Sequence, residues 1–209
     1  MAVSGCDKQT YLSAPSPLKV ASSVTCLLVP RMMVKIQRAD EVADFATCLG
    51  DIDNIFFQSS AKRDFSSQEE KQAFREMSLG RYIEKHRGSF FVALDADGRA
   101  VGYLAGCLEN PITLNHFNDV AYFRSIEDIC RDYPAHLHVN VAKRHRNRGL
   151  GTALVGRFVE WAKLHSLEGI HLVTSSTARS IPFYRRSGFT ELRTFPWNVG
   201  TSVCMGRKL

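Results

Sequence analysis

The sequence predicts an α/β or α+β domain built around a mixed sheet. Short apolar or alternating segments typical of strands occur between segments of helical periodicity. A strand at 136–141, a helix from Leu150 and a strand at 170–173 follow one another, which implies a parallel pair with a crossover helix. A glycine-containing turn at 95–98 separates two further apolar strands, and this arrangement indicates an antiparallel hairpin.

The first half of the regular chain begins at Val34. Residues 34–37 alternate like a strand, and Asp40 is placed to cap a helix that carries apolar residues up to Leu49. Residues 66–69 (Ser-Ser-Gln-Glu) offer a second helix start, and this helix should run towards His86.

The next elements are a pair of strands at 90–94 and 101–107. The turn between them ends in Gly98, which is free to adopt positive φ. We expect an irregular or helical stretch from about Asn115 to Asp132.

The last third supplies the strand–helix–strand unit and the end of the sheet. Apolar residues spaced by four, four and three form one helical face: Leu150, Leu154, Phe158 and Trp161. We expect a short helix at 181–186 and a terminal hairpin from Thr190, whose edge is available for pairing.

Length and composition fit one domain of 209 residues. We expect residues 1–32 to be a poorly ordered N-terminal extension and 33–209 to form a single domain; a leader, or a natural start at Met32 or Met33, is the alternative. No apolar stretch approaches the roughly 20 residues that span a bilayer. The six cysteines are scattered without a CxxC pair, which favours reduced thiols and a cytoplasmic location.

Basic residues exceed acidic ones, 27 to 21, and part of the excess is local. Four basic residues lie within six positions: Lys143, Arg144, Arg146 and Arg148. A solvated basic turn, a phosphate-bearing cofactor and nucleic acid each fit such a cluster. Nucleic acid is disfavoured, because the cluster lacks interleaved aromatics and a recognisable binding motif.

The most informative segment is the turn at 141–151, between a strand and an amphipathic helix. The first N–H groups of a helix lack intrahelical partners, and the helix dipole places about half a positive charge there. Glycines permit close backbone approach to a phosphate, and arginines add charge-assisted hydrogen bonds. The chain has neither a P-loop GxxxxGK[ST] motif nor a dinucleotide-binding GxGxxG motif.

Two motifs in this region resemble those of the GNAT acyltransferase superfamily. Arg146-x-x-Gly149-x-Gly151 is similar to the family's R/Q-x-x-G-x-G/A signature, and residues 183–189 (Phe-Tyr-Arg-Arg-Ser-Gly-Phe) are similar to its later aromatic segment. The element order from about Val34 onward also resembles the family. The resemblance implies a mostly antiparallel sheet with a splayed parallel strand pair, flanked by helices.

The resemblance also implies acetyl-CoA as co-substrate, with the pyrophosphate on backbone amides of the turn. It assigns these residues to cofactor binding: Asn140, Val141, Arg146, Asn147, Arg148, Gly149, Leu150, Gly151, Thr152, Thr177, Phe183 and Tyr184. This chain departs from the family where Lys143 replaces a frequent proline and Thr177 replaces an asparagine that binds pantetheine in some members. We expect no metal, because the His136-x-His138 pair lacks an apparent third ligand.

Acyl transfer needs a base, an oxyanion donor and an acid for the departing thiolate. Tyr184 resembles the family's general acid, and a core tyrosine is the alternative. His136 and His138 share one strand face and are candidate bases; ordinary polar residues of that face are the alternative. Their His-Leu-His run resembles that of arylalkylamine N-acetyltransferases, but the number of residues between the run and the glycine turn differs by one. The run also resembles acetyltransferase-like domains related to those joined to some O-GlcNAc hydrolases.

The expected function is acetyl transfer to a primary amine of a small molecule or peptide, by direct attack in a ternary complex. A catalytically inactive module that binds CoA or a partner is the alternative. We expect no nucleic-acid or membrane partner, and a monomer or homodimer. Four aromatic residues could line an acceptor pocket or belong to the core: Phe56, Phe57, Phe117 and Tyr122.

Overall fold

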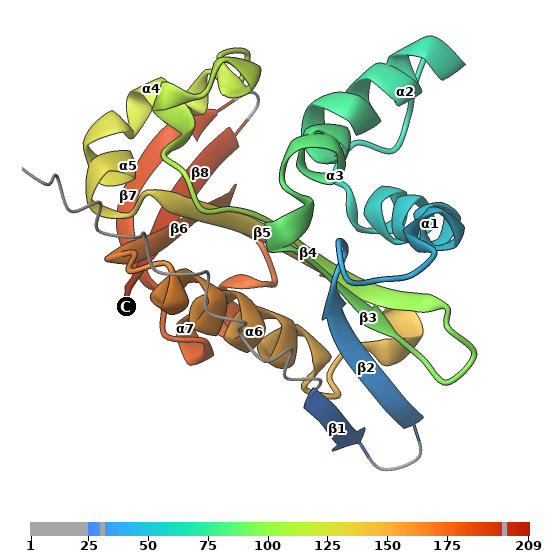
Figure 1. Cartoon of the computed structure of the whole chain (residues 1–209). Coiled ribbons are helices and arrows are strands. Elements are labelled where there is room, and N and C mark those ends of the chain that lie inside the picture. The colour runs from blue at the N-terminus through green and yellow to red at the C-terminus, as the bar shows by residue number, and fades with distance from the viewer. Residues whose placement is uncertain (1–24, 30–31, 198–199) are drawn as a thin grey trace, which may run out of the picture.

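A computed structural model describes residues 25–29, 32–197 and 200–209 and contains an eight-stranded mixed sheet (Figure 1). The strand order is β1-β2-β3-β4-β5-β6-β8-β7, and all neighbours are antiparallel except β5 and β6, which are parallel. The strands are β1 Thr25–Val29, β2 Met32–Arg38, β3 Phe90–Leu94, β4 Ala100–Cys107, β5 Ala135–Val141, β6 Gly169–Ser175, β7 Thr190–Trp197 and β8 Gly200–Lys208. This sheet confirms the predicted mixed, mostly antiparallel architecture with one parallel pair.

Helices cover both faces of the sheet (Figure 1). The α-helices are α1 Leu49–Ser59, α2 Gln68–Arg75, α3 Arg81–Lys85, α4 Tyr122–Ser125, α5 Glu127–Asp132, α6 Leu150–Leu164 and α7 Ile181–Arg186. Single turns of 3-10 helix are η1 Phe45–Cys48, η3 Arg87–Ser89, η4 Pro111–Thr113, η5 Asn115–Phe117 and η6 Lys143–His145, and η2 Glu76–Gly80 is a π-helical turn between α2 and α3.

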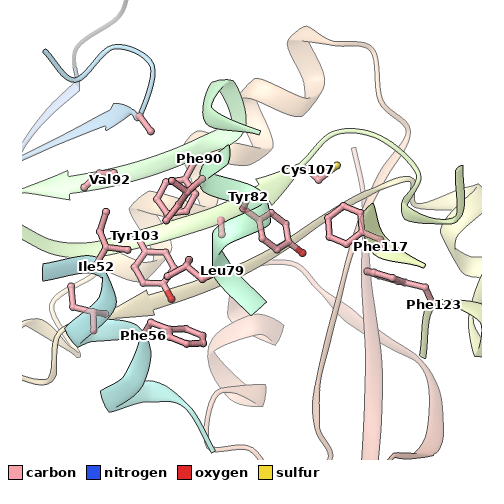
Figure 2. Packing of buried hydrophobic residues seen from close by; sticks show 14 of the residues in the cluster. Ile52, Phe56, Leu79, Tyr82, Phe90, Val92, Tyr103, Cys107, Phe117 and Phe123 are labelled. Atoms are coloured by element: carbon pink, nitrogen blue, oxygen red, sulfur yellow. The ribbon is translucent and has the colours of Figure 1, made fainter. Parts of the chain in front are cut away.

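Two apolar cores lie on opposite faces of the sheet. On one face α6 and α7 pack on the central strands, with Leu154 and Phe158 fully buried as their spacing predicts. On the other face α1, the α2–α3 segment and the 110–133 region enclose an aromatic core that includes Phe56, Tyr82 and Tyr103 (Figure 2). Successive side chains of β5 point to opposite faces of the sheet. Because a core lies on each face, alternate residues of β5 enter different cores.

Most predicted helix boundaries are confirmed, and one is wrong. The Ser67 hydroxyl accepts a hydrogen bond from the Glu70 amide at 3.2 Å, so α2 begins with the expected side-chain cap. No helix begins at Asp40. Its carboxylate instead pairs with the Arg38 guanidinium at 3.0 Å, and the chain turns until Phe45 before it becomes helical.

The predicted N-terminal extension falls only partly within the described residues. Residues 1–24 lie outside the described residues, as do 30 and 31. Thr25–Val29, which fall within the predicted extension, form β1 and pair with β2, so the sheet begins inside that segment. Across the part of the chain that the structure describes, no helix combines the length and apolar character needed to cross a membrane.

Candidate functional site

The two parallel strands pair over only a short distance. Ala135 pairs with Ile170 and His136 with His171, although β5 continues to Val141 and β6 to Ser175. Beyond His136 the outer side of β5 no longer pairs with β6, while its other side remains paired with β4 as far as Val141. The divergence leaves the carboxyl-terminal half of β5 beside an opening in the sheet.

The turn that follows β5 reaches this opening at the start of α6. Asn147 has φ of 60° and Gly149 has φ of 80°, so the backbone reverses through two left-handed residues before the helix begins. Gly149 is the N-cap and supplies no side chain to the first helical amides. A Cβ built on Gly149 would have no atom of the described chain within 4 Å, so the space beside this backbone is open.

Basic side chains surround the turn, and one of them holds it in place. Arg146 donates from Nε to the Val141 carbonyl at 2.8 Å and from Nη2 to the Ser59 hydroxyl at 3.1 Å. These bonds connect the turn to the end of β5 and to α1. Lys143, Arg144 and Arg148 are exposed on the same turn. The exposed N-terminus of a long helix and the surrounding cations give this surface a positive potential.

Helix α7 lies directly against the start of α6. A Cβ on Gly151 would be 3.2 Å from two ring atoms of Phe183 and 3.9 Å from the Val141 side chain. The missing side chain therefore lets the ring pack on the turn. Thr177 follows β6 on the far side of the opening, and its hydroxyl lies 3.0 Å from that of Ser175. The turn and α7 are thus in contact beside the diverging strands, and Thr177 lies just beyond the end of β6.

Tyr184 is buried in α7 beside Phe183 and Phe189, with ring centroids 5.0 and 6.0 Å away. No group among the described residues forms a hydrogen bond with its hydroxyl. Burial raises its pKa to about 12, so the phenol keeps its proton at neutral pH. A neutral hydroxyl in this position can donate a hydrogen bond.

His136 and His138 lie on the same face of β5, within the aromatic core. The Tyr82 ring contacts both, with centroids 5.7 Å from His136 and 5.2 Å from His138. Both ring nitrogens of His136 and Nε2 of His138 are buried without a hydrogen-bond partner. Burial lowers the pKa of His136 well below its usual range and that of His138 to about 4. Both imidazoles are therefore neutral at pH 7.

A third buried histidine adjoins them on β6. His171 is fully buried, and its ring centroid lies 5.5 Å from that of His136. Its Nδ1 lies 2.6 Å from the Tyr133 carbonyl and its Nε2 lies 3.8 Å from the Cys130 sulfur. Burial lowers its pKa to about 4. The buried rings on this face of β5 and β6 are therefore aromatic and uncharged at pH 7.

Tyr103 is a site residue that the sequence did not single out. It is fully buried on β4, and its hydroxyl accepts a 2.9 Å hydrogen bond from the Asn140 side chain. Burial, opposed by this hydrogen bond, raises its pKa, and Tyr184 is close enough to add to the shift. The only local signal was a tyrosine within the otherwise apolar run 101–107. Asn140, expected at the cofactor site, thus has an internal partner.

The four aromatic residues expected either in an acceptor pocket or in the core differ in how deeply they are buried. Phe56 and Phe117 are buried in the core, whereas Phe57 and Tyr122 are only partly buried at its margin. Figure 2 shows Phe117 facing the Tyr82 ring near the end of β4.

Comparisons with known proteins show the family and the fold of this chain. The model of the acetyltransferase (GNAT) family matches residues 54–189, more than half of the chain. The structure is similar to that of SsHAT, with a TM-score of 0.64 and 21% identity over 84% of this chain and 98% of that one. It is also similar to a GCN5-related N-acetyltransferase from Kribbella flavida, with a TM-score of 0.57 and 19% identity over 84% of this chain and 98% of that one. A third similar structure is yncA from Salmonella typhimurium, solved with its cofactor acetyl-CoA, with a TM-score of 0.54 and 19% identity over 84% of this chain and 93% of that one. At these identities the structural likeness shows a shared fold.

Proposed function

Because the chain belongs to the GNAT acetyltransferase family, we propose that it transfers an acetyl group from acetyl-CoA to a primary amine of a small molecule or peptide. The observation that carries the proposal is the opening between β5 and β6, next to the open N-terminus of α6. In this proposal the turn on one side of the opening holds the polyanionic part of the cofactor, and the buried, uncharged histidines of β5 and β6 lie on the other side.

The turn would hold the pyrophosphate of acetyl-CoA. Residues 146–149 are exposed, and the space beside Gly149 is open to a ligand. The amides of Leu150, Gly151 and Thr152 belong to the first turn of α6, where N–H groups are available to an anion. Arg148 and its basic neighbours would complement the remaining phosphate charge.

The acetyl end would lie along the unpaired side of β5. Val141 and Asn140 lie where this strand has left β6, so their backbone is positioned to align the pantetheine arm. Phe183 would cover this part of the ligand from α7, and Thr177 would face it from the end of β6. A backbone amide of β5 in this stretch is the candidate donor to the tetrahedral oxyanion.

The reaction would proceed by direct attack within a ternary complex. The amine nitrogen bonds to the thioester carbonyl carbon, and the C–S bond then breaks to release CoA thiolate. Tyr184 would donate its proton, or a strong hydrogen bond, to that sulfur. Its raised pKa makes hydrogen-bond donation the larger contribution, because full transfer from a phenol of pKa about 12 to a thiolate is uphill.

His136 and His138 would contact the acceptor side of the reaction. Their buried nitrogens lack partners within the described chain, and a buried polar group of this kind requires a ligand or water partner. With lowered pKa values they accept hydrogen bonds from an amine or a water but are weak bases. Water therefore carries the amine proton away in this proposal.

Calorimetric titration with acetyl-CoA, with CoA and ATP as comparators, tests the cofactor. Micromolar-range binding shared by CoA, and much weaker binding of ATP, is expected. Release of free thiol with a panel of primary amines then tests the reaction. Tight CoA binding without thiol release would favour the alternative of an inactive CoA-binding module, and a folded protein that binds no CoA would refute the proposal.

A further inference from the structure

A group of metal-ligating side chains lies at the end of β4, away from the turn at 146–151. Among the described residues, His86, Cys107 and Glu109 place one ligand atom each within 4.8 Å of one another. His86 follows α3, Cys107 is the last residue of β4 and Glu109 lies two residues beyond it. Figure 2 shows Cys107 at this strand end, close to Tyr82 and Phe117.

A second histidine points at this group from a different segment. Nε2 of His116, in η5, lies 2.8 Å from Nε2 of His86. Arg81 fixes η5 against α3, because its guanidinium donates to the His116 carbonyl at 2.5 Å and pairs with Asp119 at 2.6 Å. His116 therefore lies next to the imidazole of the three-residue group, in reach of a cation that His86 would hold.

Among the described residues, the thiol of Cys107 has one weak polar contact. Cys107 is fully buried, and its thiol has only a 3.6 Å contact with the Glu109 carbonyl oxygen. The two histidines can satisfy only one nitrogen each through their mutual contact. Sulfur, imidazole nitrogen and carboxylate oxygen together form a ligand set that zinc takes in proteins.

We propose that His86, Cys107, Glu109 and His116 bind a zinc-type divalent cation. In a tetrahedral site with bonds of about 2.0–2.3 Å, ligand atoms lie about 3.3–3.6 Å apart. The ligand atoms of His86, Cys107 and Glu109, which lie within 4.8 Å of one another, therefore need to approach by roughly 1 Å, and rotation of the exposed Glu109 side chain would allow this. His116 would join them by a rotation of its ring towards the cation. A thiolate and a carboxylate balance the charge of the cation, and the thiol proton is released to solvent on binding.

The site would join three segments that enclose the acceptor side. It would connect the end of α3, the end of β4 and η5, which also carry Tyr82 and Phe117 against His136. The cation thus has a structural role in the aromatic floor. The inference does not depend on the proposed function, since none of these four residues belongs to the turn or to α7.

Titration of the tag-free, chelator-treated full chain with Co²⁺ tests the site. We expect one Co²⁺ per chain, with visible d–d bands, a near-ultraviolet thiolate charge-transfer band and loss of both on addition of Zn²⁺. Cys107→Ser should abolish the charge-transfer band. Glu109→Gln, at an exposed position that leaves folding intact, should weaken binding by about 10-fold or more. Cys48→Ser, a buried cysteine outside the group, should leave binding and spectrum unchanged.

Two results would overturn the inference. One is a folded wild-type chain that takes up no Co²⁺, and the other is uptake that neither Cys107→Ser nor Glu109→Gln alters. Acetyl-CoA titration of the same samples separates the two proposals, because the metal variants should bind acetyl-CoA as the wild type does.

Discussion

The replacement Gly149→Ala tests the anion site most directly. Gly149 has φ of 80°, and a left-handed conformation costs a residue with a Cβ about 1–2 kcal/mol. The added methyl group meets no atom of the described chain, so it causes no internal clash and projects into the space proposed for the pyrophosphate. A modest loss of stability and a larger loss of affinity are therefore expected together.

The size of the affinity loss follows from the hydrogen bonds at the turn. A methyl group that holds the phosphate away from one amide removes one charge-assisted hydrogen bond, worth about 1.5–3 kcal/mol. Acetyl-CoA affinity should therefore fall by about 10- to 150-fold, as measured by calorimetry. Urea unfolding of the same variant measures the strain separately.

A matched control separates strain from contact. Gly98, in the β3–β4 turn, has φ of 75° and equally open surroundings. Gly98→Ala should lose about as much stability as Gly149→Ala but retain wild-type affinity for acetyl-CoA. If folded Gly149→Ala binds acetyl-CoA as the wild type does, the pyrophosphate does not lie on this turn.

Two further predictions concern buried titratable groups. Tyr184→Phe should lower kcat by about 10²- to 10³-fold, as expected when one hydrogen-bond donor to a developing charge is removed, and should leave acetyl-CoA affinity nearly unchanged; an unchanged kcat in steady-state assays would remove Tyr184 from this donor role. The folded-state pKa of His171 is about 4, against 6.5 for an exposed histidine. Between these values the unfolded chain binds a proton that the folded chain does not, so stability falls as pH falls, by about 1.4 kcal/mol per pH unit for this residue. Urea unfolding from pH 6.5 to 4.5 should show that His171→Gln reduces this slope by about that amount, and an unchanged slope would contradict the assignment.

The fold was largely predictable, because its elements carry local signals. The apolar face of α6, the cap at Ser67 and the turn at Gly98 each depend on neighbouring residues, and the structure confirms all three. The helix start at Asp40 was wrong, because Arg38 competes for the carboxylate that would have capped the helix. Sequence spacing predicts a parallel pair but does not give the residue at which β5 and β6 diverge.

The candidate site could be proposed from the sequence only where it is contiguous. Residues 146–151 form one turn, so their composition indicated an anion site. Strand alternation also placed His136 and His138 on one face, and the structure confirms this. Their low pKa values were not predictable, because the burial arises from Tyr82 and Phe117, which are distant in the chain. The proposed metal site was not predictable either, because His86 is distant in sequence from Cys107, Glu109 and His116.

The low basicity of these histidines determines how the reaction should depend on pH. A primary ammonium of pKa about 10.4 loses its proton to an imidazole of pKa about 4 at a cost of roughly 9 kcal/mol, whereas deprotonation into water at pH 7.4 costs about 4 kcal/mol. In the proposed reaction, the thioester should therefore be attacked by amine that has already lost its proton to solvent.

For an acceptor with this pKa, kcat/KM should rise about tenfold per pH unit from pH 6 to 8, and His138→Gln should preserve that slope. An acceptor amine of lower pKa should reach its plateau at correspondingly lower pH. A flat profile between pH 6 and 8 with an amine of high pKa would show that a group of the enzyme accepts the proton, and that the buried histidines or another base acquire higher pKa values once the substrates are bound.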